Sequence, residues 1–269
     1  MSGDEVLVFL ASIVATALFV VKWYRSIFLA WPKSRGRTGK ILLGALPIAA
    51  FFIIRFVLKN WASYDVIYDP TYITLYLLLG FAWAWFGSFV MRSCFDLSRR
   101  DDVLNLNNKA AAFAYAGGFL GITLIYAAAN IGDGPGWWCV IFAGGLGLGA
   151  WVLLAWILHA ATRAFERVTV GRDISCGIRI GCYLLASGII IGRASAGDWT
   201  DFPTTVIEFW VGWPALPLTA LAVVGELLCA RSAKDREAQG NSIIGSVLWG
   251  ATMVVAALCS VLFLLPELF

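Results

Sequence analysis

Apolar runs of membrane-spanning length alternate with short charged links along almost the whole chain. An α-helix needs about 20 apolar residues to cross a hydrocarbon core of about 30 Å. Eight runs approach this length, so we expect an all-α polytopic membrane protein with one transmembrane domain over residues 1–269. The predicted spans are 6–24, 41–58, 72–94, 110–131, 137–161, 178–196, 206–229 and 243–265.

Composition supports this class. Hydrophobic residues make up 60% of the chain and charged residues 14%, whereas soluble domains contain roughly 25% charged residues. The mean hydropathy is +0.80. Acidic residues precede the first run and no basic segment does, so we interpret that run as a retained helix rather than a signal peptide.

The Lys and Arg residues gather in alternate links. All but three of the 20 lie in or beside the links that follow the first, third, fifth and seventh runs, and the exceptions are Arg55, Lys59 and Arg193. Cytoplasmic loops carry an excess of Lys and Arg, so we expect both termini outside, on the periplasmic side. The net charge of +3 is the sum of a basic set of links on one side of the membrane and a more acidic set on the other. It therefore does not indicate a nucleic-acid partner.

The chain also shows signs of repetition. An apolar run, a charged link and a second run that opens on a small or polar residue recur four times, which predicts four two-helix repeats. The two halves also correspond, because Arg55 and Arg193 stand 138 residues apart and Asn108 and Asn241 stand 133 apart. Repeats with an even number of spans would be parallel, related by an axis along the membrane normal. The links read PKSRGRTGK (32–40), SRRDDVLNLNNK (98–109), ERVTVGRDISCG (166–177) and RSAKDREAQGNS (231–242).

Small residues concentrate in the fourth and fifth runs, where they predict close helix packing. In a membrane, small side chains let two helix backbones approach each other. Two uses are open, namely contacts inside one bundle and a contact between subunits. The predicted packing residues are Ala110, Ala114, Gly117, Gly118 and Gly121 in the fourth run, and Gly145 and Gly149 in the fifth. Asn107, Asn108 and Asn241 are predicted to cap helices, because an Asn side chain accepts from free amides at a helix start.

The motif Asn108-Lys109-Ala110-Ala111, continued by Gly117 and Gly121, resembles the YjfL-like bacterial inner-membrane proteins, a family catalogued as domain of unknown function 350. The resemblance covers about residues 72–199, which leaves 1–71 and 200–269 as flanking helix pairs. In the next unit the motif reads Ser175-Cys176-Gly177-Ile178 and lacks the Asn. The resemblance implies a multi-pass fold in the bacterial inner (cytoplasmic) membrane and transfers no catalytic residue.

Reactive constellations are missing from the sequence. The six cysteines form no C-x-x-C pair, and His159 is the single histidine. No Ser-His-Asp set or phosphate-binding glycine loop is present. We therefore expect no enzyme, no catalytic residue, no metal and no cofactor, and we interpret His159 as a polar interfacial residue rather than a haem ligand.

A few ionisable residues fall within the predicted spans, where such residues are expensive and are candidates for function. Arg55, Arg193, Glu208 and Glu226 are the candidates for a polar interior. The alternative for the arginines is that they snorkel to the headgroups. Glu226 has a short side chain in the apolar stretch VVGELLC, which predicts burial beside a cation, Arg92 or Arg179 by depth.

Proline interrupts the seventh run. Pro203, Pro214 and Pro217 lie within residues 198–217 and each removes a backbone donor. The span should then begin with an interfacial or re-entrant segment, followed by a shorter helix from about Trp213. A cavity, if one exists, should open here.

The sequence favours an oligomeric scaffold or a subunit of a membrane complex, because packing faces are abundant. The alternative is a conduit or transporter for an ion or small solute, which the repeats and buried charges favour. The expected partners are membrane lipids and either copies of the chain or other membrane-protein subunits.

Overall fold

A computed structural model describes residues 2–30, 36–234 and 239–264, and it describes side chains in these ranges except over 231–242. Seven helices of the described chain are long and apolar enough to cross a membrane. A bent pair that passes the same test brings the number to eight. The expected all-α fold is confirmed. The spanning elements are α1 (Gly3–Ala30), α2 (Thr38–Asn60), α4 (Pro70–Phe95), α5 (Lys109–Ala128), α6 (Trp137–Thr162), α8 (Ile174–Ala194) and α11 (Gln239–Cys259), which η3 (Ser260–Leu264) extends.

The bent pair occupies the proline-rich region. The segment α9 (Phe202–Glu208) and η2 (Phe209–Gly212) precedes α10 (Ala215–Lys234), and the two parts meet at 42°. Pro203 lies in the first turn of α9, where its missing amide is not needed. Pro214 stands directly before α10, so the break falls where the sequence removes a backbone donor.

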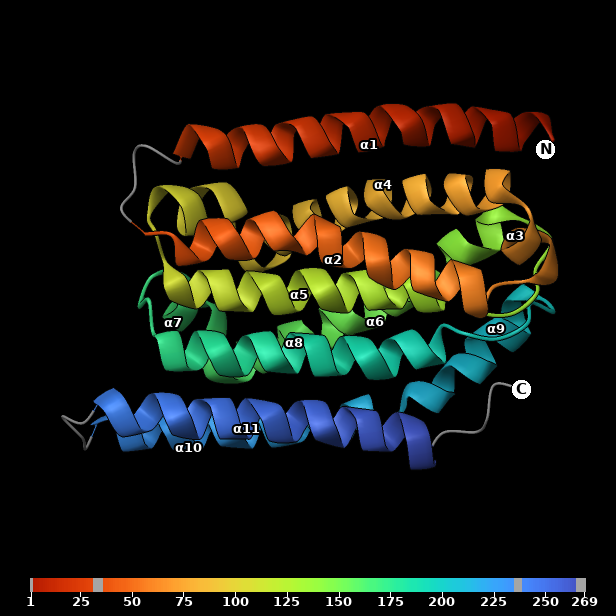
Figure 1. Cartoon of the computed structure of the whole chain (residues 1–269). Helices are drawn as coiled ribbons and strands as arrows, with labels where there is room; N and C mark the ends of the chain where they lie inside the picture. Colours follow the sequence, from red (N-terminus) through yellow and green to blue (C-terminus); the bar gives the residue numbers. More distant parts are fainter. Residues whose placement is uncertain (1, 31–35, 235–238, 265–269) are drawn as a thin grey trace.

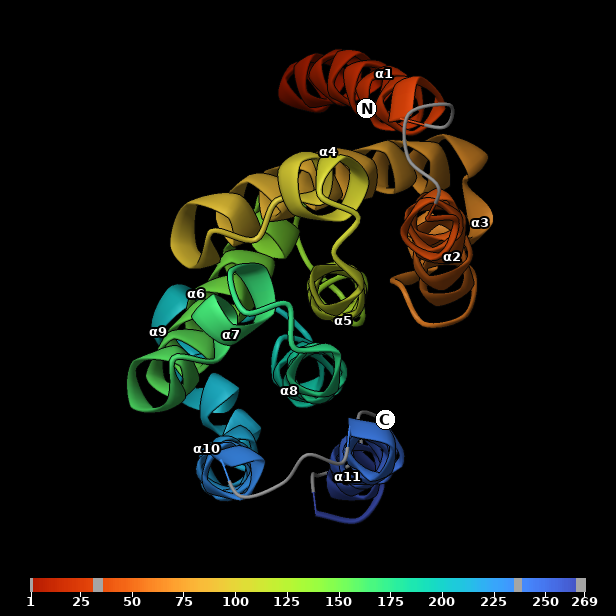
Figure 2. The same cartoon turned by 90° about the vertical axis from the view of Figure 1, so that its left-hand side faces the viewer.

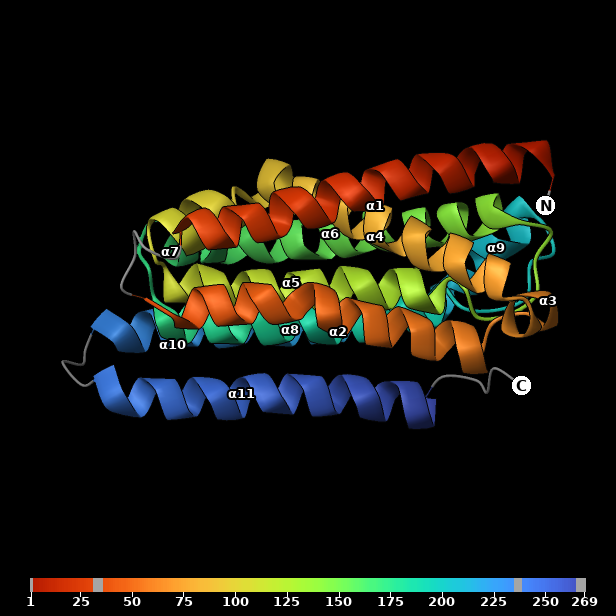
Figure 3. The same ribbon diagram turned by 45° about the horizontal axis from the view of Figure 1, so that its top comes forward.

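The long helices form two layers. Helices α2, α5, α8 and α11 lie in order in one layer, and α1, α4, α6 and α10 form the other (Figure 2). Helices α1 and α11 lie at opposite edges of this array (Figure 3). The start of α1 and the end of α11 lie at the same end of the molecule, as an even number of spans requires (Figure 1). Which side of the membrane this end faces stays a prediction from the charges.

Short helices fill the links at the opposite end and the loop before α4. These are η1 (Arg99–Asn105) between α4 and α5, α7 (Ala164–Thr169) between α6 and α8, and α3 (Tyr64–Tyr68) after α2. Asn108 caps α5, since its side chain accepts from the Ala111 amide at 3.2 Å. Asn107 does not cap α5, because it lies before the cap residue Asn108 and its backbone is left-handed (φ 50°). Asn is one of the few residues that tolerate this conformation. Asn241 lies in the first turn of α11, and its side chain is outside the described residues.

The closest packing in the molecule joins α5 and α8. An added Cβ at Gly117 would strike the carbonyl of Gly181, and one at Gly121 would lie 2.5 Å from the Leu184 carbonyl oxygen. Gly177 packs in the same way on the backbone of Ala110. Ala114 and Gly118 are buried on the same helix. In the apolar 18-residue stretch of α5, 83% of the residues are buried inside the protein, against 17% in the corresponding stretch of α1. Helices α5 and α8 therefore form the centre of the array.

Gly145 and Gly149 behave differently from the glycines of α5. Both lie on the exposed side of α6, and an added Cβ would meet no heavy atom within 4 Å. They therefore do not pack helices together within the described chain. Gly144 and Gly147 take that place, because they face Trp83 and Ser195 on the inner side of α6.

Candidate functional site

A buried ion network lies at the end of the array that carries the links. Glu226 of α10 is 2% exposed. Its carboxylate accepts hydrogen bonds from Nε and Nη2 of Arg179 on α8, the latter at 2.8 Å. It also accepts a hydrogen bond from Nη1 of Arg167 on α7 at 2.9 Å. Charge-assisted and bidentate bonds of this kind are the strong class of protein hydrogen bonds.

The network continues from both arginines. Nη1 of Arg179 donates to the Ser246 hydroxyl of α11 at 2.7 Å. Nη2 of Arg167 donates to the carboxylate of Asp173 at 2.9 Å, and Asp173 in turn caps α8 by accepting from the Cys176 amide. The network therefore ties α7, α8, α10 and α11 together at one level.

The charges in the network are balanced, since two guanidinium groups face two carboxylates. Burial opposes the positive charge on Arg167, but the neighbouring Cys176, Glu226 and Asp173 side chains outweigh that effect and raise its pKa. The Cys176 thiol lies 3.5 Å from Glu226 Oε2, so both carboxylate oxygens of Glu226 are engaged. Such a site can hold helices in register, and it presents no free base to a substrate.

The sequence located part of this network. Glu226 is buried as expected, and Arg179 is its partner, one of the two cations predicted by depth. Arg92 instead lies on the surface, 3.6 Å from Asp101. Arg167 was not predicted, although its place in the basic link directly before α8 could have suggested it.

The other residues predicted for a polar interior do not join Glu226. Arg55 is exposed on α2, and Glu208 is exposed on α9. Arg193 is half-buried in the last turn of α8. An Arg close to a helix end can extend to the boundary, which explains why Arg55 lies outside the packed interior.

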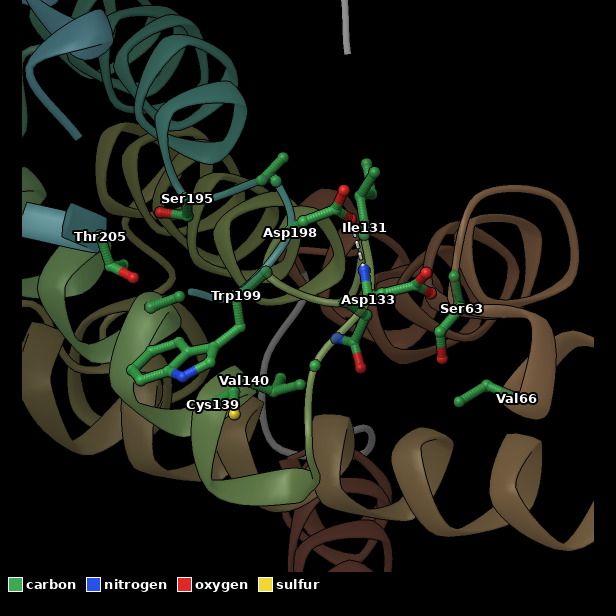
Figure 4. A pocket seen from close by; sticks show the side chains of 18 of the residues that line it. Ser63, Val66, Ile131, Asp133, Cys139, Val140, Ser195, Asp198, Trp199 and Thr205 are labelled. Atoms are coloured by element: carbon green, nitrogen blue, oxygen red, sulfur yellow. Dashed lines mark hydrogen bonds between the residues drawn. The ribbon is translucent and has the colours of Figure 1, made fainter. Parts of the chain in front are cut away.

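A small cavity of about 60 Å³ lies at the opposite end, where the loops after α2, α5 and α8 meet (Figure 4). The Asp133 amide donates to the Asp198 carboxylate at 2.7 Å, which joins two of these loops. Gly132 and Gly197 have left-handed backbones (φ +101° and +142°), which glycine adopts without steric cost. The cavity has room for a few water molecules.

Polar acceptors form part of the cavity wall. Asp133, Asp198 and Glu208 line it, so Glu208 belongs to the cavity rim rather than to the bundle interior. Asn130 is 5% exposed and also lines the cavity, and its Oδ1 has no hydrogen-bond partner among the described residues. The cavity borders residues 198–217, where the sequence indicated a mouth.

Within the described ranges, no group of three His, Cys, Asp or Glu residues could hold a metal ion. His159 is half-buried near the end of α6, with its ring 5.6 Å from that of Phe165. Its Nδ1 is buried and has no partner in the described part of the chain.

These features define an all-α polytopic membrane protein with a buried ion network at one end and a small cavity, lined in part by carboxylates, at the other. Residues 65–195 match the family model Domain of Unknown Function (DUF350), just under half of the chain. The matched segment runs from α3 to α8, close to the predicted 72–199. No curated protein and no solved structure matches the chain. Arg167, Asp173 and Arg179 lie inside the match, whereas Glu226 and Ser246 lie beyond it.

Proposed function

We propose that this chain is an integral protein of the bacterial inner membrane that acts as a subunit of a membrane assembly formed with copies of itself. The observation that carries the proposal is the outward face of α6. Gly145 and Gly149 stand four residues apart on that face with open space in front of them. Leu153 and Trp156 extend the same exposed face along α6.

The geometry of this face suits a helix-helix contact between two copies. A Gly-x-x-x-Gly pair removes two side chains from a helix surface, so that the backbone of another helix can pass close to it. Two copies in the same orientation would bring their α6 helices together about an axis along the membrane normal. Such an interface uses the same patch twice and closes as a dimer.

A matched pair of variants tests the proposal. Gly149→Leu fills the proposed contact, whereas Gly245→Leu makes the same change at another exposed glycine with open space, on α11. We expect the wild type and Gly245→Leu to keep the same oligomeric mass in mild detergent, and Gly149→Leu to shift to the 29.3 kDa monomer. Equal masses for all three proteins would remove the support for α6 as the interface.

We also propose that the two hairpins of the DUF350 domain are repeats with a spacing of 65 residues. Asn108 and Asp173 are the caps of α5 and α8. Each follows a left-handed residue, Asn107 or Arg172, and Gly132 and Gly197 repeat the spacing after the helices. This spacing accounts for one hairpin rather than for half of the chain, so it fits the two-helix unit better than the spacings of 133 and 138 residues.

A conduit for an ion or small solute is the second candidate. The observation that favours it is the unpartnered Asn130 Oδ1 at a cavity with three carboxylates. A flux assay in liposomes with the wild type and Asn130→Leu tests it, because a conduit that starts at this cavity should lose flux when the amide is removed. Equal flux from empty and protein-containing liposomes would exclude it.

A further inference from the structure

A groove of about 680 Å³ runs beside the outer part of α2, separate from the cavity described above. Its floor is apolar and includes Phe52, Phe56 and Val57 of α2 and Leu124 of α5. Arg55 and Lys59 also line it. The groove therefore combines an apolar floor with two cations.

The two cations share one face of α2. Arg55 and Lys59 stand four residues apart, so their side chains are neighbours on the helix surface. Both are exposed, and neither forms an ion pair or a side-chain hydrogen bond with any residue of the described chain. They are two of the three cations at this end of the molecule.

The depth of Arg55 in the membrane indicates that the two cations need an anionic partner. Arg55 lies six residues before Trp61, which at 1.5 Å per residue places it about 9 Å below the end of α2. A cation at that depth is costly unless an anion accompanies it. Extension of Arg55 toward the boundary brings its guanidinium to the level of Lys59, where two like charges meet and no acidic residue of the described chain lines the groove. An anion from outside the chain resolves both problems.

The apolar floor specifies what the anion is attached to. Phe56 packs edge-on against Trp61, with ring centroids 5.2 Å apart, so an aromatic wall stands next to the cations. Trp is typical of the headgroup level of a bilayer. From that level, the floor of Phe52, Phe56 and Leu124 extends into the depth that acyl chains occupy. A free phosphate would use the cations and leave this floor uncovered.

We propose that the groove binds one anionic phospholipid, whose phosphate lies between Arg55 and Lys59 and whose acyl chain lies along Phe52, Phe56 and Leu124. The site is independent of the α6 interface, because it lies on the other layer of the array (Figure 2). Charge complementarity selects the anionic headgroup, and the length of the floor selects a lipid over a soluble anion.

The test is retention of lipid by the full chain in nanodiscs and in mass spectrometry of the intact complex. The nanodiscs contain phosphatidylglycerol mixed with phosphatidylcholine. The probe variant is Arg55→Gln with Lys59→Gln. The control is Arg25→Gln with Arg100→Gln, which removes the same charge from exposed positions at the opposite end.

We expect the wild type and the control to retain phosphatidylglycerol, and the probe variant to bind it on the order of 30-fold more weakly, from the attraction of two cations. Leu124→Trp fills the floor and keeps both cations, so it should also lose the lipid. Inorganic phosphate in the millimolar range should not compete. Equal retention by the probe variant, equal loss by the control, or displacement by inorganic phosphate would each overturn the proposal.

Discussion

Glu226→Leu is the substitution with the largest effect that the structure predicts on stability. Glu226 accepts two hydrogen bonds from Arg179 and one from Arg167, and the Arg179 side chain is 4% exposed. Leucine leaves that guanidinium buried without a counter-charge. Removal of one partner from a buried ion pair costs about 3–5 kcal/mol. We therefore expect a loss of that size in the free energy of unfolding.

Two further variants separate the charge from the packing. Glu226→Gln keeps an acceptor oxygen for one arginine, so it should lose about 1–3 kcal/mol. Arg92→Gln breaks an exposed pair, with side chains 66% and 52% exposed, and should cost about 0–1 kcal/mol. The assay is denaturant unfolding in bicelles followed by tryptophan fluorescence.

The double variant Arg179→Leu with Glu226→Leu gives the sharpest outcome. Replacing both members of a buried pair by apolar side chains is often close to neutral, and Arg167 keeps Asp173 as a partner. The double variant should therefore be more stable than Glu226→Leu alone. The reasoning is refuted if Glu226→Leu is no less stable than Arg92→Gln. It is also refuted if the double variant loses as much stability as the single variants Glu226→Leu and Arg179→Leu lose together.

Three other predictions test separate parts of the account. Cysteine labelling should reach Ser2 from the periplasm and should not reach a cysteine at the exposed position Arg100, because the basic links face the cytoplasm; labelling of position 100 from outside would reverse the orientation. Gly121→Leu should cost about 1–3 kcal/mol, since the side chain strikes the Leu184 carbonyl, whereas Gly245→Leu should cost little; equal melting temperatures would contradict this. Burial raises the pKa of Asp102 against the opposing hydrogen bond from the Ser98 amide. Its protonated form is thus favoured by folding, and the stabilisation is present below pH 3.8 and lost as the pH rises through the folded pKa. Asp102→Asn should raise the melting temperature at pH 7, with a gap that closes toward pH 4, and a gap independent of pH would refute the assignment.

The spans and the burial of Glu226 could be predicted from the sequence because each follows from a local property. Twenty apolar residues have few alternatives in a chain of this composition. A short carboxylate in an apolar stretch must find a partner inside the protein. Arg179 lies at the matching depth on a neighbouring helix, so depth alone could pair it with Glu226.

The remaining contacts depend on how the helices turn about their axes. Gly117 and Gly121 carry the same motif as Gly145 and Gly149, yet one pair is buried against α8 and the other faces outward. Both helices are hydrophobic on all sides, so the sequence does not mark the inner face. Arg167 reaches Glu226 because Arg163, the left-handed residue directly before α7, turns that short helix toward α8. This turn has no signal in the apolar pattern.

The most direct test of the proposed assembly is disulfide formation at α6 in native membranes. A single cysteine is placed at Gly149 in a cysteine-free background, with a second protein that carries it at Gly245 as the control. Oxidation should produce a species at twice the 29.3 kDa of the chain for Gly149→Cys and none for Gly245→Cys. A Gly149→Cys protein that stays monomeric under oxidation, at an expression level equal to the control, would contradict the account.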